Sequence, residues 1–196
     1  MKKQRNIIMD EERQEEKKPL IREIMEYIVW FAAVIVAVQF ITRYIGVFSV
    51  VDGESMEPTL YHGEYLWVDK LDYHLSEPER FDVVIFPVDY NGEIRHFVKR
   101  IIALPEETVY IDEKGNIIID DEILPDPYGK EVIADYNRYR AAEPITLGPD
   151  EYFVLGDNRN HSSDSRTDIV GNVKRSDIIG RVAVCLWPFD KIGVVE

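Results

Sequence analysis

The hydrophobic pattern begins with an uncharged apolar segment near the N-terminus. Residues 27–41 carry no charge, and apolar positions extend the segment to residues 24–45. A helix over residues 24–45 would be about 33 Å long at 1.5 Å per residue, which matches a hydrocarbon core of about 30 Å. A cleaved signal peptide and the core helix of a soluble protein can show the same pattern. Because no Ala-x-Ala sequence follows, the pattern favours a retained transmembrane anchor.

The basic residues around this segment predict its orientation. Lys17, Lys18 and Arg22 lie just before it, whereas Arg43 is followed by no further basic residue until Lys70. Basic residues concentrate on the cytoplasmic side of membrane spans. We therefore expect a single-pass chain with a cytoplasmic tail (residues 1–23), a transmembrane anchor (residues 24–45) and an extracytoplasmic domain (residues 46–196).

Beyond the anchor, short apolar or alternating runs recur between turn signals, as is typical of β-strands. The loop at residues 112–116 contains Gly115 and predicts a hairpin between its two flanking strands. Residues 124–143 are rich in proline and predict a long surface loop or a small insertion. No helical period competes, so the predicted fold is one mainly β domain on a helical stalk. The predicted strands are residues 65–68, 82–86, 97–102, 109–111, 117–119, 152–155 and 179–186.

Charge and cysteine content narrow the class of protein. The net charge is −14, and the first 26 residues are balanced, so the acidic excess lies in the body. Such a body lacks the basic surface that a phosphate backbone requires, which argues against a nucleic-acid partner. The single cysteine, Cys185, excludes an internal disulfide and lies in an apolar run that predicts a buried strand.

Three polar clusters suggest chemistry, and the first surrounds Ser55. This serine follows an apolar run, with Gly53 before it and Pro58 after it. The glycine permits an unusual backbone conformation and the proline fixes a turn, so the hydroxyl can be held with little freedom. A serine that only caps a local turn would give the same pattern.

The second cluster surrounds Lys99, which interrupts an otherwise apolar strand. Strand alternation places Lys99 and Phe97 on one face and Val98 and Arg100 on the other. Burial disfavours the charged form of lysine and lowers its pKa, which would allow the neutral amine to accept a proton from a serine. An edge-strand lysine that reaches to solvent is the alternative.

The third cluster, residues 155–166, follows another apolar strand and is dense in hydrogen-bonding groups. Asp157 and Asp164 can pair with neighbouring arginines, including Arg166, and Ser162 offers a hydroxyl that could orient a lysine amine. A solvated loop would have a similar composition.

A histidine base remains an alternative to Lys99, because four histidines are present: His62, His74, His96 and His161. The second glycine of the Gly-x-Ser-x-Gly elbow is missing around Ser55, which weighs against a Ser-His-Asp arrangement. No His-Glu-x-x-His or paired-cysteine motif is present, so no metal or organic cofactor is predicted.

Taken in order, four segments resemble the conserved boxes of bacterial type I signal peptidases of the Gram-positive kind. They are residues 55–60, 80–86, 98–105 and 156–166. The resemblance implies an antiparallel signal-peptidase-like fold. It also implies a serine endopeptidase in which Ser55 attacks the scissile carbonyl, Lys99 is the general base, and Ser162 hydrogen-bonds the lysine amine.

The same resemblance implies substrates and supporting residues. The substrates would be secreted preproteins cut after an Ala-x-Ala-like site at the lipid bilayer, with Met56, Phe97 and Val98 lining the substrate pockets. Arg100 with Asp157, and Asp164 with Arg166, would form structural ion pairs.

The sequence departs from the family pattern at several positions. Gly53 stands where some members have a serine that donates to the oxyanion. The resemblance therefore implies that the backbone N–H of Ser55 helps to hold the oxyanion, and it leaves the second donor unassigned. Phe81, Ala103 and Glu106 replace glycines. Two other interpretations predict different properties. A self-cleaving regulator of the SOS-repressor kind would be cytoplasmic, and an anchored binding module would not need Ser55.

Overall fold

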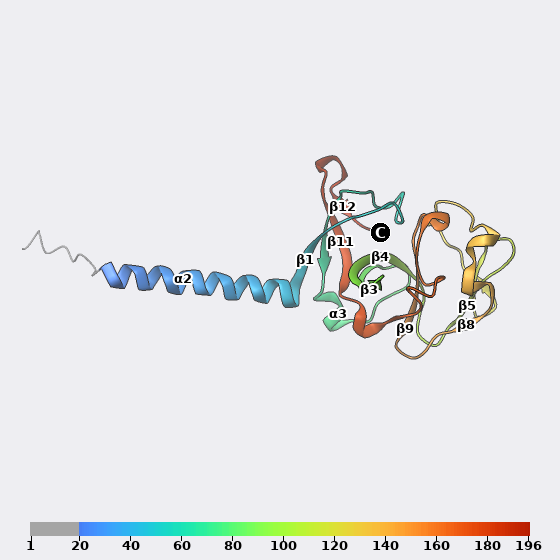
Figure 1. Cartoon of the computed structure of the whole chain (residues 1–196), viewed down its shortest axis with the longest axis horizontal. Coiled ribbons are helices and arrows are strands. Elements are labelled where there is room, and N and C mark those ends of the chain that lie inside the picture. The colour runs from blue at the N-terminus through green and yellow to red at the C-terminus, as the bar shows by residue number, and fades with distance from the viewer. Residues whose placement is uncertain (1–19) are drawn as a thin grey trace, which may run out of the picture. The chain divides into compact units, whose positions relative to one another are not determined.

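The structure, a computed structural model, describes residues 20–196, which divide after Thr42 into two compact units. The described part of the first unit is mainly helix α2 (Leu20–Phe40), and a π-helical turn, η2 (Ile41–Ile45), follows it across the division (Figure 1). Leu20–Ile45 has a mean hydropathy of 2.1 and none of it is buried, so it is long and apolar enough to cross a membrane. The helix begins earlier than the predicted anchor, and the predicted cytoplasmic tail lies, up to residue 19, outside the described residues.

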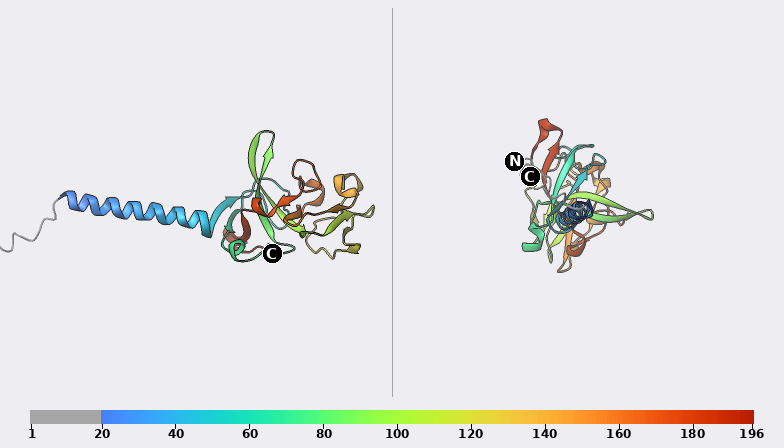
Figure 2. Two further views of the ribbon diagram at one scale, coloured as in Figure 1. Left: turned by 90° about the horizontal axis from the view of Figure 1, so that it is seen from below. Right: turned by 90° about the vertical axis from the view of Figure 1, so that its left-hand side faces the viewer.

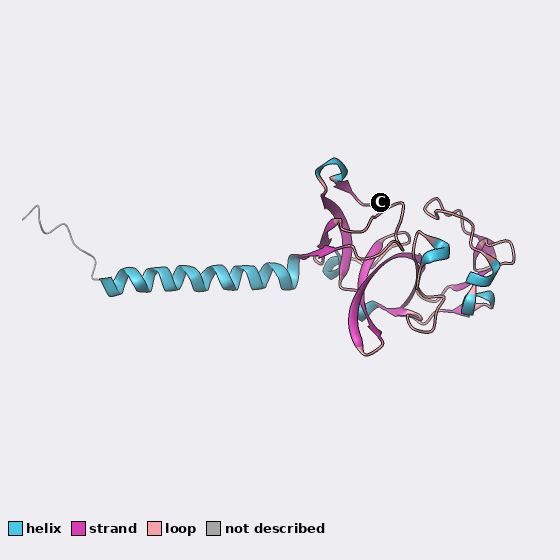
Figure 3. Cartoon of the chain, turned by 45° about the horizontal axis from the view of Figure 1, so that its top comes forward, coloured by secondary structure: helices cyan, strands magenta, loops and turns pink. Residues whose placement is uncertain are grey.

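The second unit is built from two antiparallel sheets, which confirms the mainly β prediction (Figure 3). The larger sheet has the strand order β1-β2-β11-β3-β4-β9-β10, with β12 paired to β11. Its strands are β1 (Gly46–Val50), β2 (Tyr65–Asp69), β3 (Val83–Tyr90), β4 (Glu93–Ala103), β9 (Glu151–Leu155), β10 (Val173–Lys174), β11 (Gly180–Trp187) and β12 (Gly193–Val194). The smaller sheet has the order β7-β6-β5-β8, from β5 (Thr108–Ile111), β6 (Ile117–Ile119), β7 (Glu122–Ile123) and β8 (Ile145–Thr146).

Short helical turns connect the strands. They are α3 (Asp72–Leu75) and the 3-10 helices η3 (Asp135–Asn137), η4 (Tyr139–Ala142), η5 (Arg159–His161), η6 (Arg175–Asp177) and η7 (Phe189–Lys191). All seven predicted strands are present, and β5 and β6 form the predicted hairpin.

The hairpin of β3 and β4 is longer than the sequence analysis predicted. It closes at Asn91 and Gly92, whose φ angles of 57° and 83° suit the two-residue turn that hairpins favour. The Asn-Gly pair was an available signal for this turn. Figure 2 shows the hairpin, in green, projecting from the body of the domain.

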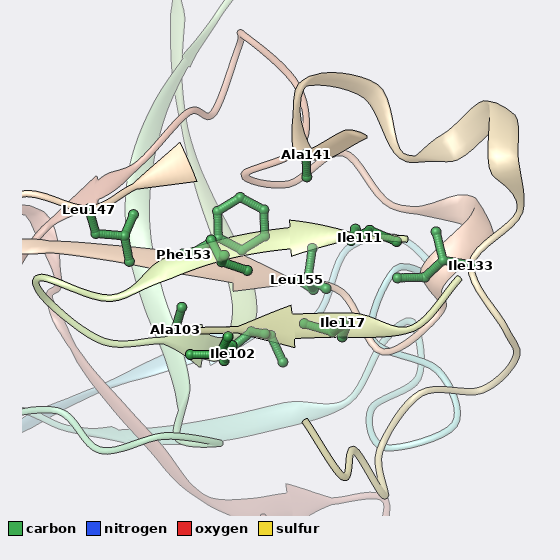
Figure 4. Packing of buried hydrophobic residues seen from close by; sticks show 11 residues of the cluster. Ile102, Ala103, Ile111, Ile117, Ile133, Ala141, Leu147, Phe153 and Leu155 are labelled. Carbon is green, nitrogen blue, oxygen red and sulfur yellow. The ribbon is translucent and has the colours of Figure 1, made fainter. Parts of the chain in front are cut away.

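Strand β9 links two of the three hydrophobic clusters of the described residues because both of its faces are buried. Phe153 and Leu155 pack with the smaller sheet, whereas Tyr152 and Val154 pack with β3 and β4. Figure 4 shows the first of these clusters, with Phe153 and Leu155 among residues of β5 and β6. Burying such side chains contributes about 1.5–3 kcal/mol each. The segments that continue from β4 and β9 are therefore held rigidly.

Residues 124–143, predicted as a long surface loop or a small insertion, lie mostly at the surface but are partly buried. They contain no strand, but Ile133, Asn137 and Ala141 are buried. The Asn137 side chain donates to Asn160 at 3.0 Å, and the Asn137 carbonyl accepts from Arg166 at 3.0 Å. This segment therefore packs against the loop after β9, an interaction that its composition does not reveal.

Candidate active site

Ser55 lies on the turn between β1 and β2. Its neighbour Met56 and nearby Leu60 are each 1% exposed, and the Leu60 N–H donates to the Met56 carbonyl at 2.9 Å. These buried side chains anchor the turn in the cluster beneath it. Gly53 has a φ of 103°, a conformation that side-chain-bearing residues rarely adopt. The local sequence therefore presents the Ser55 hydroxyl from a fixed backbone.

Lys99 reaches this hydroxyl from β4. Its Nζ lies 2.7 Å from Ser55 Oγ and donates to the Val98 carbonyl at 2.8 Å. The residue is only 4% exposed. Burial lowers the pKa of Lys99 to about 8, although the carboxylates of Asp164 and Asp157 partly oppose the shift. A neutral amine in contact with a serine hydroxyl is the arrangement that a general base requires.

Three ion pairs of low exposure involve the loop after β9. Arg100 binds Asp157 through two nitrogens, at 2.9 and 2.7 Å, and both side chains are fully buried. Arg166 binds Asp164 in the same bidentate way, at 2.8 Å for each bond. The third pair joins Arg159 to Asp126.

Each of these pairs is neutral in itself, so a protonated Lys99 has no unpaired carboxylate as its own partner among them. An unpaired buried charge is costly, which agrees with the lowered pKa of Lys99. Asp157 also accepts from Thr59 Oγ1 at 2.6 Å, which ties the Ser55 turn to the segment after β9.

Ser162 lies close to the Ser55 backbone but does not make the expected hydrogen bond to Lys99. Its Oγ is buried and has no hydrogen-bond partner among the described residues. The Lys99 amine is instead bonded to Ser55 and Val98. A Cβ on Gly156 would meet Ser162 Oγ at 2.3 Å and the Ser55 carbonyl at 2.4 Å, so Gly156 allows the two serine segments to approach.

A cleft of about 660 Å³ opens at Ser55 and Lys99. The three predicted pocket residues, Met56, Phe97 and Val98, line it together with Ser55 and Lys99. Lys99 Nζ lies 5.2 Å from the centre of the Phe97 ring. The sequence analysis did not anticipate other residues of the wall, among them Tyr90, Arg95, His161 and Ser163.

Asn158 is a further residue that the sequence analysis missed. Its backbone N–H donates to the Ser55 carbonyl at 3.0 Å, and its side-chain amide donates to the Glu54 carbonyl at 3.0 Å. Asn158 therefore fixes the backbone on both sides of the Glu54–Ser55 peptide bond. Its position in a polar loop was visible, but its partners lie about a hundred residues earlier in the chain, and no local signal predicts that contact.

The histidines make no described contact with the Ser55 hydroxyl. His62 Nδ1 accepts from the Gly53 N–H at 3.2 Å and lies 3.5 Å from Asp52 Oδ1, with its side chain 67% exposed. His96 and His161 are exposed residues of the cleft wall. No group of side chains within residues 20–196 is suited to hold a metal ion.

Two of the replaced glycines have a physical explanation. Phe81 and Glu106 adopt φ angles of 73° and 69°, in the left-handed region that favours glycine. Phe81 packs against Tyr128 with ring centroids 5.2 Å apart, and its carbonyl accepts from Arg100 at 2.8 Å. Phe81 and Glu106 therefore adopt a backbone conformation typical of glycine although both carry side chains.

Comparison with known proteins assigns the family. Residues 24–187 match the family described as "Signal peptidase, peptidase S26". The chain is 36% identical to probable signal peptidase I-2 of Synechocystis, over 83% of this chain and 72% of that protein. It is 34% identical to a signal peptidase I of Bacillus amyloliquefaciens, over 83% and 89% of the two chains. A crystal structure of a signal peptidase I from Enterococcus faecalis is 30% identical, with a TM-score of 0.45, over 55% of this chain and 98% of that one. The chain thus belongs to the signal peptidase family, peptidase S26.

Proposed function

We propose that this protein is a membrane-anchored serine endopeptidase that removes N-terminal signal peptides from exported preproteins after an Ala-x-Ala-like site. Ser55 is the nucleophile and Lys99 the general base. The observation that carries the proposal is the 2.7 Å approach of the buried Lys99 amine to Ser55 Oγ. Family membership supports the peptidase activity and the preprotein substrates.

The chemistry follows from the protonation state of Lys99. The neutral amine takes the proton of the Ser55 hydroxyl as Oγ bonds to the scissile carbonyl carbon. The resulting ammonium gives this proton to the leaving amine, the peptide bond breaks, and the signal peptide remains as an ester on Ser55. Lys99 then takes a proton from water as the water oxygen bonds to the ester carbonyl carbon. It passes this proton to Ser55 Oγ as the ester bond breaks, which releases the signal peptide as an acid and restores both residues. Asp157 and Asp164 stabilise the transient ammonium because both raise the pKa of Lys99.

The developing oxyanion needs hydrogen-bond donors, and we assign the Ser55 N–H to it. The Gly53 N–H already donates to His62, and Gly53 has no side chain to contribute. Ser162 is assigned the task of orienting the Lys99 ammonium, since its buried hydroxyl has no other described partner.

The substrate fits as an extended strand beside β4. One edge of β4 pairs with β3 from Glu93 to Arg100, but β9 pairs with the other edge only from Arg100 onward. Residues 94–99 therefore keep a free edge that faces the cleft, where a peptide can add by backbone hydrogen bonds. Met56 and Val98 provide an apolar wall that suits small side chains next to the cut.

The position of Ser55 in the chain agrees with substrates that emerge from a bilayer. Ser55 follows Ile45, the end of the apolar helix, by about ten residues, so even a fully extended chain keeps it within about 35 Å of that end. We propose the orientation that the basic residues predict, with the N-terminus cytoplasmic and the domain outside.

The test compares the full chain in detergent with its Ser55→Ala and Lys99→Ala variants on one preprotein that carries an Ala-x-Ala site. We expect both variants to lose cleavage. Ser176→Ala and Lys114→Ala, at exposed positions, serve as matched controls and should cleave normally. Cleavage retained by Ser55→Ala or by Lys99→Ala would overturn the dyad.

A further inference from the structure

The cleft extends from the dyad in one direction along β4. Pairing with β9 closes the edge of β4 from Arg100, so the free edge at residues 94–99 runs from Lys99 toward the tip of the β3–β4 hairpin. The cleft wall follows this stretch and includes Lys99, Phe97 and Arg95. A peptide that lies along the free edge therefore passes the hairpin on one side of its scissile bond only.

Side chains of one strand face form a continuous row along this path. Lys99, Phe97 and Arg95 alternate with residues of the opposite face, so they line the same side. Lys99 Nζ is 5.2 Å from the Phe97 ring, the Phe97 and Tyr90 rings are 6.2 Å apart, and the Arg95 guanidinium lies 5.2 Å from the Tyr90 ring. The row thus begins at the catalytic amine and ends at a fixed positive charge.

Arg95 retains capacity to bind a ligand. Its described hydrogen bond is from Nη2 to Glu93 at 3.0 Å, and the two side chains are 56% and 72% exposed. An exposed ion pair of this kind is weak and readily exchanged. A guanidinium has five N–H donors and matches a carboxylate in a bidentate way, so a second acidic group can bind beside or in place of Glu93.

The other end of the cleft has the opposite charge. Asp52 and Glu54, which flank the approach to Ser55, belong to its wall. A carboxylate on the substrate would be repelled near the cut and attracted near Arg95. The charge pattern therefore distinguishes positions along the bound peptide.

We propose that Arg95 is a specificity-determining residue that selects a carboxylate side chain at about the fifth residue before the cut. The assignment rests on the proposed function, which places the small residues before the cut in the cleft that Ser55, Lys99 and Phe97 line. If the residue before the cut lies opposite Lys99, residue-by-residue pairing along β4 brings the fifth residue opposite Arg95.

The test uses three versions of one Ala-x-Ala preprotein, with Glu, Gln or Lys at the fifth residue before the cut. The full chain in detergent at low ionic strength should show a kcat/KM about two- to fivefold higher for Glu than for Lys, the range of an exposed ion pair. The ratio should fall to about one in Arg95→Gln and invert in Arg95→Glu. With the same three residues placed after the cut, the Glu-to-Lys ratio of kcat/KM should be the same in wild type and in Arg95→Gln.

A second variant separates this role from a structural one. Glu93→Gln removes the competing carboxylate, so it should increase the preference for Glu, and added salt should reduce the preference in every protein that shows it. An unchanged ratio in Arg95→Gln, or a ratio of one in wild type, would overturn the assignment of Arg95. The proposed function itself would be overturned if wild type did not cleave the preprotein that carries Gln, or if Ser55→Ala did cleave that preprotein.

Discussion

The burial of Lys99 should cost the folded protein stability, and the cost should depend on pH. The pKa of Lys99 is about 8 in the folded state against an ordinary value of 10.5. Below pH 8 the lysine is protonated in both states, so folding buries a charge. Between pH 8 and 10.5 only the unfolded chain holds the proton, and stability rises with pH. Above 10.5 both states are neutral. The difference between these pKa values corresponds to about 3 kcal/mol.

Replacing Lys99 by methionine removes the titration and keeps an unbranched apolar side chain. We expect the free energy of unfolding of wild type, minus that of Lys99→Met, to increase by about 3 kcal/mol from pH 8 to 10.5. Urea unfolding of the full chain in detergent at several pH values measures this difference, in which the other titrating groups cancel. Lys114→Met, at an exposed position, should run nearly parallel to wild type. Parallel curves for wild type and Lys99→Met would refute the argument that burial neutralises the base.

Three further predictions concern the surroundings of the dyad. Arg100→Met leaves the Asp157 carboxylate buried and unpaired, so it should lower the free energy of unfolding, measured by denaturation, by about 3–5 kcal/mol. The double variant that also carries Asp157→Leu should recover part of this loss. Glu106→Gly should raise the free energy of unfolding by about 1 kcal/mol because it relieves a left-handed backbone, whereas Glu113→Gly, at an exposed position with no positive φ, should lower it. Asn158→Ala removes the hydrogen bond to the Glu54 carbonyl, so it should reduce kcat/KM about tenfold or more. It should lower the free energy of unfolding by only about 1 kcal/mol. An unchanged kcat/KM would contradict the positioning role of Asn158.

The strands were predictable because their signals are local. Alternation or continuous apolar runs mark each of the seven predicted strands, and the glycine-containing loop marks the β5–β6 hairpin. The Asn91-Gly92 turn has an equally local signal. Its flanking residues, including Glu93, are polar or exposed on both faces, so hydrophobic patterning alone underestimates the length of β4.

The site was predictable in its residue types and only partly in its contacts. The apolar neighbours of Lys99 indicated its burial, and strand alternation placed Phe97 on the same face. The pairing of Ser55 with Lys99 joins segments that are distant in sequence, and the motif resemblance suggested it where periodicity could not. Asn158 and Asp126 escaped notice because their partners are set by the packing of residues 124–143 and the Ser55 turn, which no local pattern specifies.

The most direct test of the dyad is the pH dependence of kcat/KM for one preprotein, because this quantity reports the pKa of the base in the free enzyme. Neutral Lys99 is the active form in our account. We therefore predict that kcat/KM rises with pH through an apparent pKa of about 8 and then levels off. A rise centred near pH 6.5, the ordinary pKa of histidine, would contradict the assignment of Lys99 as the base.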